Sequence, residues 1–339
     1  MLKWYEQTGP EGDIVISTRV RLARNLSGRP FVAHMSDSQR EQVLGECLAA
    51  AKVSKDDLRY TDVEKLSPVE RRALTERHAV SPEFEQMSGR RGLLLSPDER
   101  ISVMINEEDH LRIQYMEAGL NIEKCLEGAQ RLDDLFDAGL SYAFSPDLGY
   151  LTACPTNLGT GMRISVMLHL DALTRNRRME SLTRALADVG LTVRGVYGEG
   201  SGAEGGVYQI SNQLTLGPTE QELANKLKNA VLQIIERERA MRSAEYKAAP
   251  DQVEDGVWRA LGTARSARIM SSAEAMKLIS RLRLGVGLGI LKKPDIAGLN
   301  ALSSSIGPAC VMLAGAAGDS ASRDKFRAGL MRKALGGEM

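Results

Sequence analysis

The sequence is poor in cysteine and has no excess charge of either sign. Four cysteines, Cys47, Cys125, Cys154 and Cys310, lie far apart among 339 residues and form no Cys-x-x-Cys pair. This spacing argues against a zinc ribbon and against a disulfide framework, so we expect a reducing, cytoplasmic compartment. The 44 basic and 44 acidic side chains cancel. Overall charge therefore indicates no nucleic-acid partner.

Long apolar runs are also missing. No stretch of about 18 apolar residues is available to span a bilayer, and the first residues, Met-Leu-Lys-Trp-Tyr-Glu, contain no apolar run of the signal-peptide type. We therefore expect a soluble protein without a membrane partner. The phosphate-binding loop Gly-x-x-x-x-Gly-Lys-Ser/Thr is absent too. Any nucleotide must then be held by other groups.

Hydrophobic periodicity predicts two domains. Alternating or continuous apolar segments predict strands at residues 13–16, 101–105, 111–116, 150–153, 191–197 and 207–212. Helical spacing predicts helices at residues 37–51 (capped by Ser36), 69–78, 121–136 and 220–247. Later residues show only helical candidates, at 254–261, 272–284, 295–303 and 322–335, with a flexible loop at 314–322. We predict an α+β domain over residues 1–250 and a small all-α domain over residues 251–339.

A glycine-rich loop joins the last two predicted strands, which should form a hairpin. Residues 200–207, Gly-Ser-Gly-Ala-Glu-Gly-Gly-Val, fit the glycine loop of protein kinases and contain the dinucleotide fingerprint. A dinucleotide site needs a helix after the glycines, whereas a strand is predicted here. The protein-kinase interpretation lacks His-Arg-Asp and Asp-Phe-Gly, and the next lysine, Lys226, falls in a helix. A hairpin loop that could close over a substrate is the favoured interpretation.

Arginines could replace a phosphate-binding loop, because the planar guanidinium fork binds phosphate oxygens bidentately. Arg19 and Arg21 share one face if their segment is a strand. Asn-Glu-Glu-Asp-His at 106–110 precedes Arg112, and Cys-Pro-Thr-Asn-Leu-Gly-Thr at 154–160 precedes Arg163. Arg194 then lies beside the glycine loop. Each segment alone has an ordinary interpretation, such as a solvated basic strand or an exposed acidic turn.

Together and in this order, the segments resemble the phosphagen kinases, the family of creatine and arginine kinases. The resemblance implies an antiparallel sheet flanked by helices, with ATP bound through five arginines and a contacting histidine. Mg²⁺ would be held mainly through the nucleotide phosphates, without a separate protein metal site. The implied ATP-binding residues are Ser17, Thr18, Arg19, Val20, Arg21, His78, Arg112, Arg163, Ile164, Ser165, Val166, Met167, Arg194, Gly195, Val196, Tyr197 and Gly198.

The resemblance also implies a substrate guanidinium held by carboxylates. Glu108 and Glu199 would grip it, with Glu107 in the same catalytic group and Cys154 as the neighbouring thiolate. A guanidinium is a poor nucleophile, since its neutral form lies roughly 9 kcal/mol uphill at pH 7. Two carboxylates can orient the group and accept its proton as the N–P bond forms. Arginines and Mg²⁺ then offset the charge of the transferred phosphoryl group.

The ends of the chain resemble one branch, the bacterial protein-arginine kinases. Only sixteen residues precede Ser17, where the metabolite kinases carry a helical domain, and the predicted helical domain follows instead. This difference implies a more open substrate site. Residues 323–328 fit the branch's Arg-Asp-x-x-Arg-Ala motif, which implies an allosteric phosphoarginine site made of Arg323, Asp324, Lys325, Phe326, Arg327 and Ala328.

Elementary chemistry allows such a site, because Asp324 could accept a guanidinium while Arg323 or Arg327 meets the phosphate. The ordinary alternative is a helix start capped by Ser322 with exposed charges. Residues without a predicted catalytic role are interpreted as structural: Cys47, Cys125, Cys310, His34 and His169.

The resemblance implies a kinase that phosphorylates exposed arginines of proteins and marks these proteins for proteolysis by a Clp-type ATPase in the stress response. It also implies a zinc-binding activator protein and a homodimer. Two alternatives stay open. One is a kinase for free arginine or another small guanidino metabolite, and the other is a non-catalytic reader of phosphoarginine.

Overall fold

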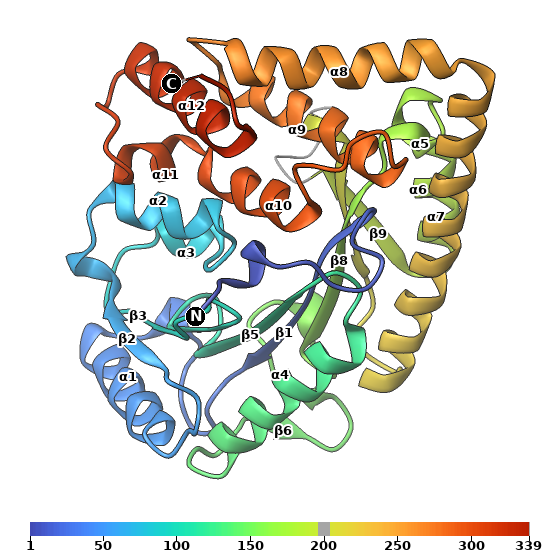
Figure 1. Cartoon of the computed structure of the whole chain (residues 1–339). Helices are drawn as coiled ribbons and strands as arrows, with labels where there is room; N and C mark the ends of the chain where they lie inside the picture. Colours follow the sequence, from blue (N-terminus) through green and yellow to red (C-terminus); the bar gives the residue numbers. More distant parts are fainter. Residues whose placement is uncertain (196–203, 339) are drawn as a thin grey trace.

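An eight-stranded antiparallel sheet forms the centre of the molecule in the computed structural model, which describes residues 1–195 and 204–338 (Figure 1). The strand order is β2-β3-β4-β5-β1-β8-β10-β9. The strands are β1 (Val15–Arg24), β2 (Arg59–Asp62), β3 (Gly92–Leu95), β4 (Ile101–Ile105), β5 (Leu111–Ala118), β8 (Met162–His169), β9 (Leu191–Gly195) and β10 (Val207–Asn212). A separate small hairpin pairs β6 (Phe144–Ser145) with β7 (Gly149–Tyr150).

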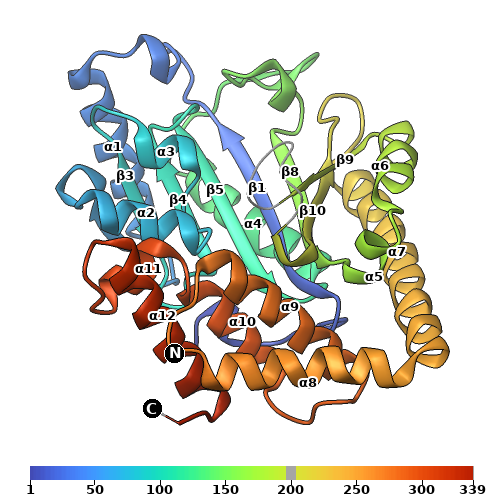
Figure 2. The same cartoon turned by 90° about the horizontal axis from the view of Figure 1, so that it is seen from above.

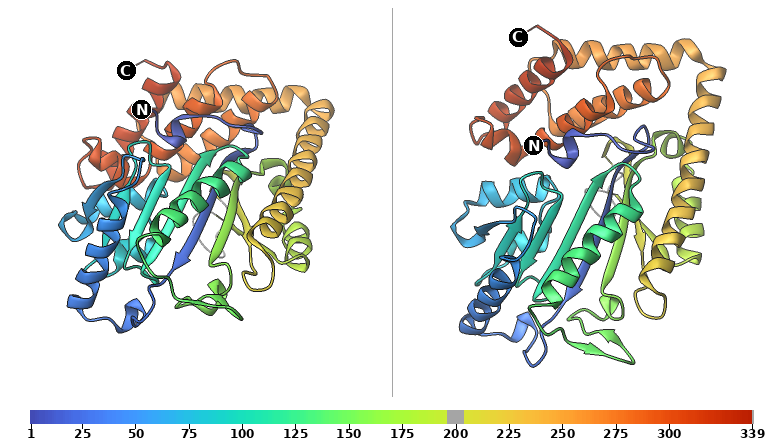
Figure 3. Two further views of the ribbon diagram at one scale, coloured as in Figure 1. Left: turned by 90° about the horizontal axis from the view of Figure 1, so that it is seen from below. Right: turned by 60° about the horizontal axis from the view of Figure 1, so that its bottom comes forward.

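Helices cover the two faces of this sheet unequally. Figure 3 shows α4 lying across one face, with α7 along the β8–β10 side. Val20, Leu22 and Ile164 pack beneath these helices in the main apolar core. On the opposite face, α2 and α3 cover only the β3–β4 edge, where Phe84 packs against Met104. The helices before residue 250 are α1 (Asp37–Ala51), α2 (Pro68–Glu76), α3 (Pro82–Gln86), α4 (Ile122–Asp137), α5 (Asp171–Arg175), α6 (Met179–Asp188) and α7 (Glu220–Ala248).

A C-terminal helical region, residues 250–338, continues directly from α7 and lies beside α2 (Figure 2). It has an apolar core of its own, which includes Leu261, Ile279, Leu299 and Met331. Over the described residues beyond 250 the structure contains helices and no strand. These helices are α8 (Pro250–Ser266), α9 (Ser272–Gly287), α10 (Ile296–Ser305), α11 (Pro308–Leu313) and α12 (Ser320–Leu335).

Most predicted elements are present, and the differences have physical causes. The strand predicted at residues 13–16 is too short, because β1 begins at Val15 and continues through Arg24, so that it carries the arginines within the sheet. The predicted strand at 150–153 is wrong beyond Tyr150. The sequence interpretation missed β8, whose side chains are nearly all buried, so that it lacks the alternation of a half-exposed strand.

The start of α12 also differs from the alternative that placed a cap at Ser322. The helix begins at Ser320, and the Asp319 carboxylate accepts a hydrogen bond from the Ser322 backbone N at 2.9 Å. Asp319 is therefore the cap. In the described part of the chain, no helix combines the length and apolar character needed to cross a membrane.

Candidate active site

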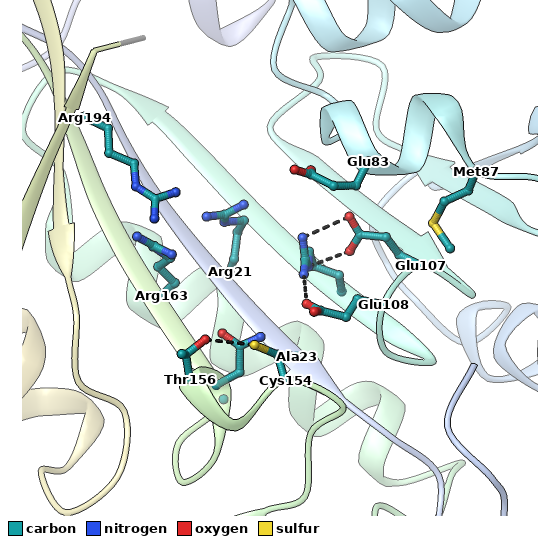
Figure 4. Close-up of a pocket in the computed structure, with 13 residues that line it drawn as sticks. Arg21, Ala23, Glu83, Met87, Glu107, Glu108, Cys154, Thr156, Arg163 and Arg194 are labelled. Carbon is teal, nitrogen blue, oxygen red and sulfur yellow. Dashed lines mark hydrogen bonds and ion pairs between the residues drawn. The ribbon is translucent and has the colours of Figure 1, made fainter. Parts of the chain in front are cut away.

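Five arginines project from the face of the sheet that α4 and α7 leave uncovered. Arg21 on β1 is paired in register with Arg163 on β8, and Arg112 on β5 lies opposite Ala23. On the far side, Arg194 of β9 lies opposite Gln209 of β10. Directly paired residues, and residues two apart on a strand, share a face of the sheet. Arg19 therefore joins the other four, and Figure 4 shows Arg21, Arg163 and Arg194 converging on one pocket.

These cations are close together, and Arg19, Arg21 and Arg163 form no ion pair with the described residues, whereas Arg112 contacts Glu107. Burial, together with repulsion from Arg163 and Arg112, lowers the pKa of Arg19 to about 10. Burial and repulsion from neighbouring arginines also lower the pKa values of Arg21 and Arg163. Arg19 donates to the Gln209 amide oxygen at 2.9 Å and Arg163 to the Ser211 hydroxyl at 3.2 Å, both neutral acceptors. A polyanion binding here would relieve this repulsion.

The acidic turn between β4 and β5 is held rigidly. Asn106 adopts a left-handed φ of 61°, and its side-chain amide donates to the carbonyls of Arg40 and Arg90. Asp109 accepts from the Asn25 amide at 2.6 Å and from the Ala153 backbone N at 2.7 Å. These bonds fix Glu107, Glu108 and the segment leading to Cys154 in one arrangement.

The two consecutive glutamates have different environments. Glu107 is 1 % exposed, contacts Arg112 Nε at 2.7 Å and accepts a hydrogen bond from the Ser81 hydroxyl. Burial raises the pKa of Glu107, while Arg112 opposes the rise. The Glu108 side chain is 44 % exposed and contacts Arg112 Nη2 at 3.1 Å. Glu107 is therefore placed to hold the arginine, whereas Glu108 is accessible to a substrate.

Cys154 lies in the same pocket as Glu108 (Figure 4). Its Sγ atom is 3.0 Å from the Thr156 hydroxyl. The short helical turn Pro155–Asn157 follows it. The thiol is thus partly exposed at the position where a group bound by Glu108 would lie.

Two adjoining cavities organise these residues. The first, of about 350 Å³, is bordered by Glu107, Glu108, Cys154 and Arg163. The second, of about 440 Å³, is bordered by residues that include Arg19, His78, Gln114 and Gly195. Both cavities are bordered by Arg21, Glu83 and Arg194. A guanidinium in the first cavity and a phosphate chain extending from the second would meet at these shared residues.

His78 borders the second cavity in a left-handed conformation, with a φ of 63°. Its carbonyl accepts a hydrogen bond from the Gln114 amide at 2.8 Å. Burial and the nearby Arg19 lower the pKa of His78 to about 4, so the ring is neutral near pH 7. A neutral ring can contact a nucleotide without adding to the positive charge.

Other predicted nucleotide residues occupy less direct positions. Val20, Ile164 and Val166 belong to the apolar core on the opposite face, while Thr18 donates to the Gly119 carbonyl at 2.7 Å. Ser17, Ser165 and Met167 are buried in the sheet. Four predicted residues lie outside the described ones: Val196, Tyr197, Gly198 and Glu199.

Sequence reasoning missed three organising residues. Asn25 ties the acidic turn to β1, Ser81 bonds Glu107, and Glu83 borders both cavities. The available signal was the Ser81-Pro82 pair, which is typical of a helix start. Indeed, the Ser81 hydroxyl accepts from the Phe84 backbone N and caps α3.

The predicted phosphoarginine motif lies on α12 and borders neither cavity. Arg327 is buried and donates to the carbonyls of Ile306 at 2.8 Å and Met270 at 2.9 Å, as well as to Asp324 at 2.6 Å. Arg323 donates to the Gly318 carbonyl at the exposed start of the helix.

Comparison with known proteins agrees with this geometry. Residues 40–241 match the family described as ATP:guanido phosphotransferase, C-terminal catalytic domain. Residues 250–338 match the protein-arginine kinase McsB C-terminal domain. The chain belongs to the ATP:guanido phosphotransferase family, in its protein-arginine kinase branch. The predicted family and fold class are thereby confirmed.

Similar proteins extend over nearly the whole length of this ATP:guanido phosphotransferase. A protein-arginine kinase of Desulforamulus reducens is 44% identical, covering 98% of this chain and 95% of its own. A protein-arginine kinase of Moorella thermoacetica is 41% identical, and the match covers 99% of this chain and 97% of the relative. Among solved structures, lombricine kinase has a TM-score of 0.62 at 29% identity, over 70% of this chain and 69% of its own.

Proposed function

We propose that this protein transfers the γ-phosphoryl group of ATP to arginine side chains of other proteins. The observation that carries the proposal is the junction of two cavities at Arg21 and Arg194. One cavity is lined by poorly compensated arginines and His78, and the other holds the accessible carboxylate of Glu108 beside Cys154.

In the proposed reaction, the triphosphate lies along the arginine face and the acceptor guanidinium enters beside Glu108. A guanidinium nitrogen attacks the γ-phosphorus in line, an N–P bond forms, and the bond to the β–γ bridging oxygen breaks as ADP leaves. The nitrogen's proton passes to a carboxylate, for which Glu108 is accessible. Glu199 is the second proposed carboxylate. Mg²⁺, held mainly by phosphate oxygens, would add positive charge at the transferring group.

The surrounding residues have supporting roles in this scheme. Glu107 holds Arg112 through its contact at 2.7 Å and so orients a phosphate ligand. Cys154, which borders the first cavity, would contact the bound guanidinium through its sulfur. Arg163 pairs directly with Arg21 across the strands, and both guanidinium groups would contact the transferred phosphoryl group.

Several parts of the proposal concern partners and regulation. The acceptors would be proteins with exposed arginines, and the chain would work in the cytoplasm as a homodimer with a zinc-binding activator protein and a Clp-type ATPase. The names of the similar proteins and the matching C-terminal region support the choice of proteins as acceptors. Separate apolar cores support the division at residue 250.

We also propose the phosphoarginine role of residues 323–328, with a division of labour. The guanidinium of Arg327 is occupied by two carbonyls and Asp324, so Arg327 would position Asp324. Arg323, at the exposed helix start, would meet the phosphate.

The competing substrate is a free guanidino metabolite. Free L-arginine and an arginine-rich protein should be offered together with Mg-ATP labelled at the γ-position, and both products should be quantified at neutral pH. We expect label on the protein, and its loss in Glu108→Gln with nucleotide binding retained. Efficient phosphorylation of free arginine would contradict the choice of substrate. Binding of phosphoarginine proteins without any transfer would instead indicate a reader.

A further inference from the structure

The last residue of α2 joins the catalytic sheet to the C-terminal helical region. Both carboxylate oxygens of Glu76 accept backbone hydrogen bonds from the first turn of α11. Oε1 accepts from Ala309 N at 3.0 Å and Oε2 from Cys310 N at 2.9 Å. These N–H groups have no partner within their own helix, because they belong to its first turn. Glu76 supplies both partners.

The backbone opposite Glu76 is shaped for this contact. Gly307 precedes α11, and a Cβ atom at that position would overlap Glu76 Oε2. Its φ of −59° and ψ of 153° are open to any residue, so the glycine is needed for space and not for backbone freedom. A methyl group at residue 307 would therefore displace the carboxylate without changing any charge.

The same turn of α2 borders the proposed nucleotide cavity. Thr75, Glu76 and His78 all face this cavity. Between them, Arg77 turns away and contacts Glu99 at 3.1 Å. His78 is left-handed, a conformation that is costly for a non-glycine residue and persists only where the surroundings fix it. Glu76 and Arg77 hold the chain immediately before it.

The contacts continue from α11 into the helical region. Gly307 follows Ile306, whose carbonyl accepts from the buried Arg327 Nε at 2.8 Å. Arg327 also bonds Asp324. A series of hydrogen bonds thus leads from α12, through residues 306–310 and Glu76, to the chain segment that ends at His78.

A second attachment reaches His78 from the N-terminal segment. Asn300 on α10 donates to the Gln7 carbonyl at 2.9 Å. Trp4, buried in the same segment, has its ring centre 6.5 Å from that of His78. Figure 1 shows α10 and α11 lying above this part of the catalytic region. His78 is therefore flanked by two segments that both bond the helical region.

We infer that Glu76 is a positioning residue, through which the C-terminal helical region sets the nucleotide affinity of the site by fixing His78. The inference rests on the proposed nucleotide role of His78. If the carboxylate is lost, two N–H groups lose their partner and the end of α2 loses its attachment. His78 then has fewer constraints in its bound conformation, and ATP must supply that ordering.

Nucleotide binding to the full-length protein tests this inference. The dissociation constant of Mg-ATP is measured by calorimetry for wild type, Glu76→Gln, Gly307→Ala and the double variant. Glu70→Gln is the matched control, since it removes the same charge from the same helix while glutamine can retain the cap with Ser67. For Glu76→Gln and for Gly307→Ala we expect the dissociation constant of Mg-ATP to rise about 5- to 10-fold, which is in the range typical of coupling between sites.

The double variant separates a shared contact from general damage. Because both substitutions break the same contact, that of Glu76 with α11, we expect the double variant to bind Mg-ATP as tightly as each single variant does. The KM for the protein acceptor should stay within about twofold, since the first cavity does not include Glu76. Unchanged Mg-ATP affinity in Glu76→Gln and Gly307→Ala would overturn the inference. So would an equal loss of affinity in Glu70→Gln.

This test does not depend on the identity of the acceptor. Weakened Mg-ATP binding in the two variants would support the inference even if no arginine became phosphorylated, a result that would contradict the proposed function alone. Arginine phosphorylation with unchanged nucleotide affinities would contradict only the inference.

Discussion

The two faces of the sheet hold arginine in opposite ways. On the open face, Arg21 lies among other cations, and its pKa is lowered by burial and by their repulsion. Three residues later on the same strand, Arg24 points to the other face and is fully buried. There it bonds both oxygens of Asp133, at 3.0 and 2.6 Å, and its guanidinium lies 3.5 Å from the ring centre of Tyr150.

This difference distinguishes a ligand site from a structural ion pair. Arg24 has its counter-charge and a stacking partner inside the fold, so its role is complete without a ligand. For Arg19, Arg21 and Arg163, no ion-pair partner occurs among residues 1–195 and 204–338. Within this part of the chain their charge is not balanced, and the proposed nucleotide triphosphate would balance it. Arg327 on α12 resembles Arg24, because carbonyls and Asp324 occupy it.

The largest effect is expected when a cation is removed from the open face. Arg21→Met should reduce phosphoryl transfer at least about 100-fold, because a group that stabilises the transferring phosphoryl is lost. Its free energy of unfolding should stay equal or rise, since repulsion is relieved. Initial rates and urea denaturation measure the two quantities. A large loss of stability would place Arg21 in the structural class.

On the face covered by α4 and α7, Arg24→Met should have the opposite effect, with a loss of stability as its main consequence. Breaking a buried pair leaves Asp133 without its counter-charge, which costs about 3–5 kcal/mol of the free energy of unfolding. Denaturant midpoints of the variant and wild type provide the measurement. A loss below about 1 kcal/mol would show that the contrast between the faces is wrong.

On α12, Arg327 is paired within the fold and Arg323 is exposed, so the same comparison can be made there with smaller expected changes in stability. Arg327→Met leaves two buried carbonyls and Asp324 without a donor, so we expect a loss of about 1–3 kcal/mol. Arg323→Ala, at the exposed start of the helix, should change stability by no more than about 0.5 kcal/mol. Thermal unfolding of both variants separates the positions. Equal effects would contradict the division of roles within the motif.

The last prediction concerns pH. The pKa of His78 is about 4 in the folded protein, against about 6.5 in an unfolded chain. The unfolded state therefore binds more protons between these values, and the stability that His78 contributes above pH 6.5 is lost as pH falls toward 4. His78→Gln should flatten this decline in unfolding free energy measured from pH 7.5 to 4.5. Identical slopes would contradict the burial of a neutral ring.

Part of this arrangement was predictable because it is local or ordered along the chain. The spacing of Arg19 and Arg21 predicts a shared face, and the capped helix at residues 37–51 was predicted with its cap, Ser36. His169 was predicted to be structural and is buried, with Nε2 2.7 Å from the Ser280 hydroxyl. The order of the arginine, acidic and cysteine segments along the sequence indicates the family.

The remainder depends on contacts between segments far apart in the sequence. Asn25 bonds Asp109 across 84 positions, and Glu76 bonds α11 across more than 230. Neither partner has a local pattern that reveals the other. The strand β8 was missed because burial on both faces removes alternation. Short-range periodicity cannot supply such pairings.

The central claim is tested most directly by locating the transferred phosphate. An arginine-rich protein incubated with the wild-type chain and Mg-ATP should be analysed by mass spectrometry under non-acidic conditions, with Arg21→Met and Glu108→Gln as parallel samples. We predict phosphate on arginine side chains with the wild type and its near absence with both variants. Phosphate only on hydroxyl side chains, or undiminished arginine phosphorylation by Arg21→Met, would contradict the account.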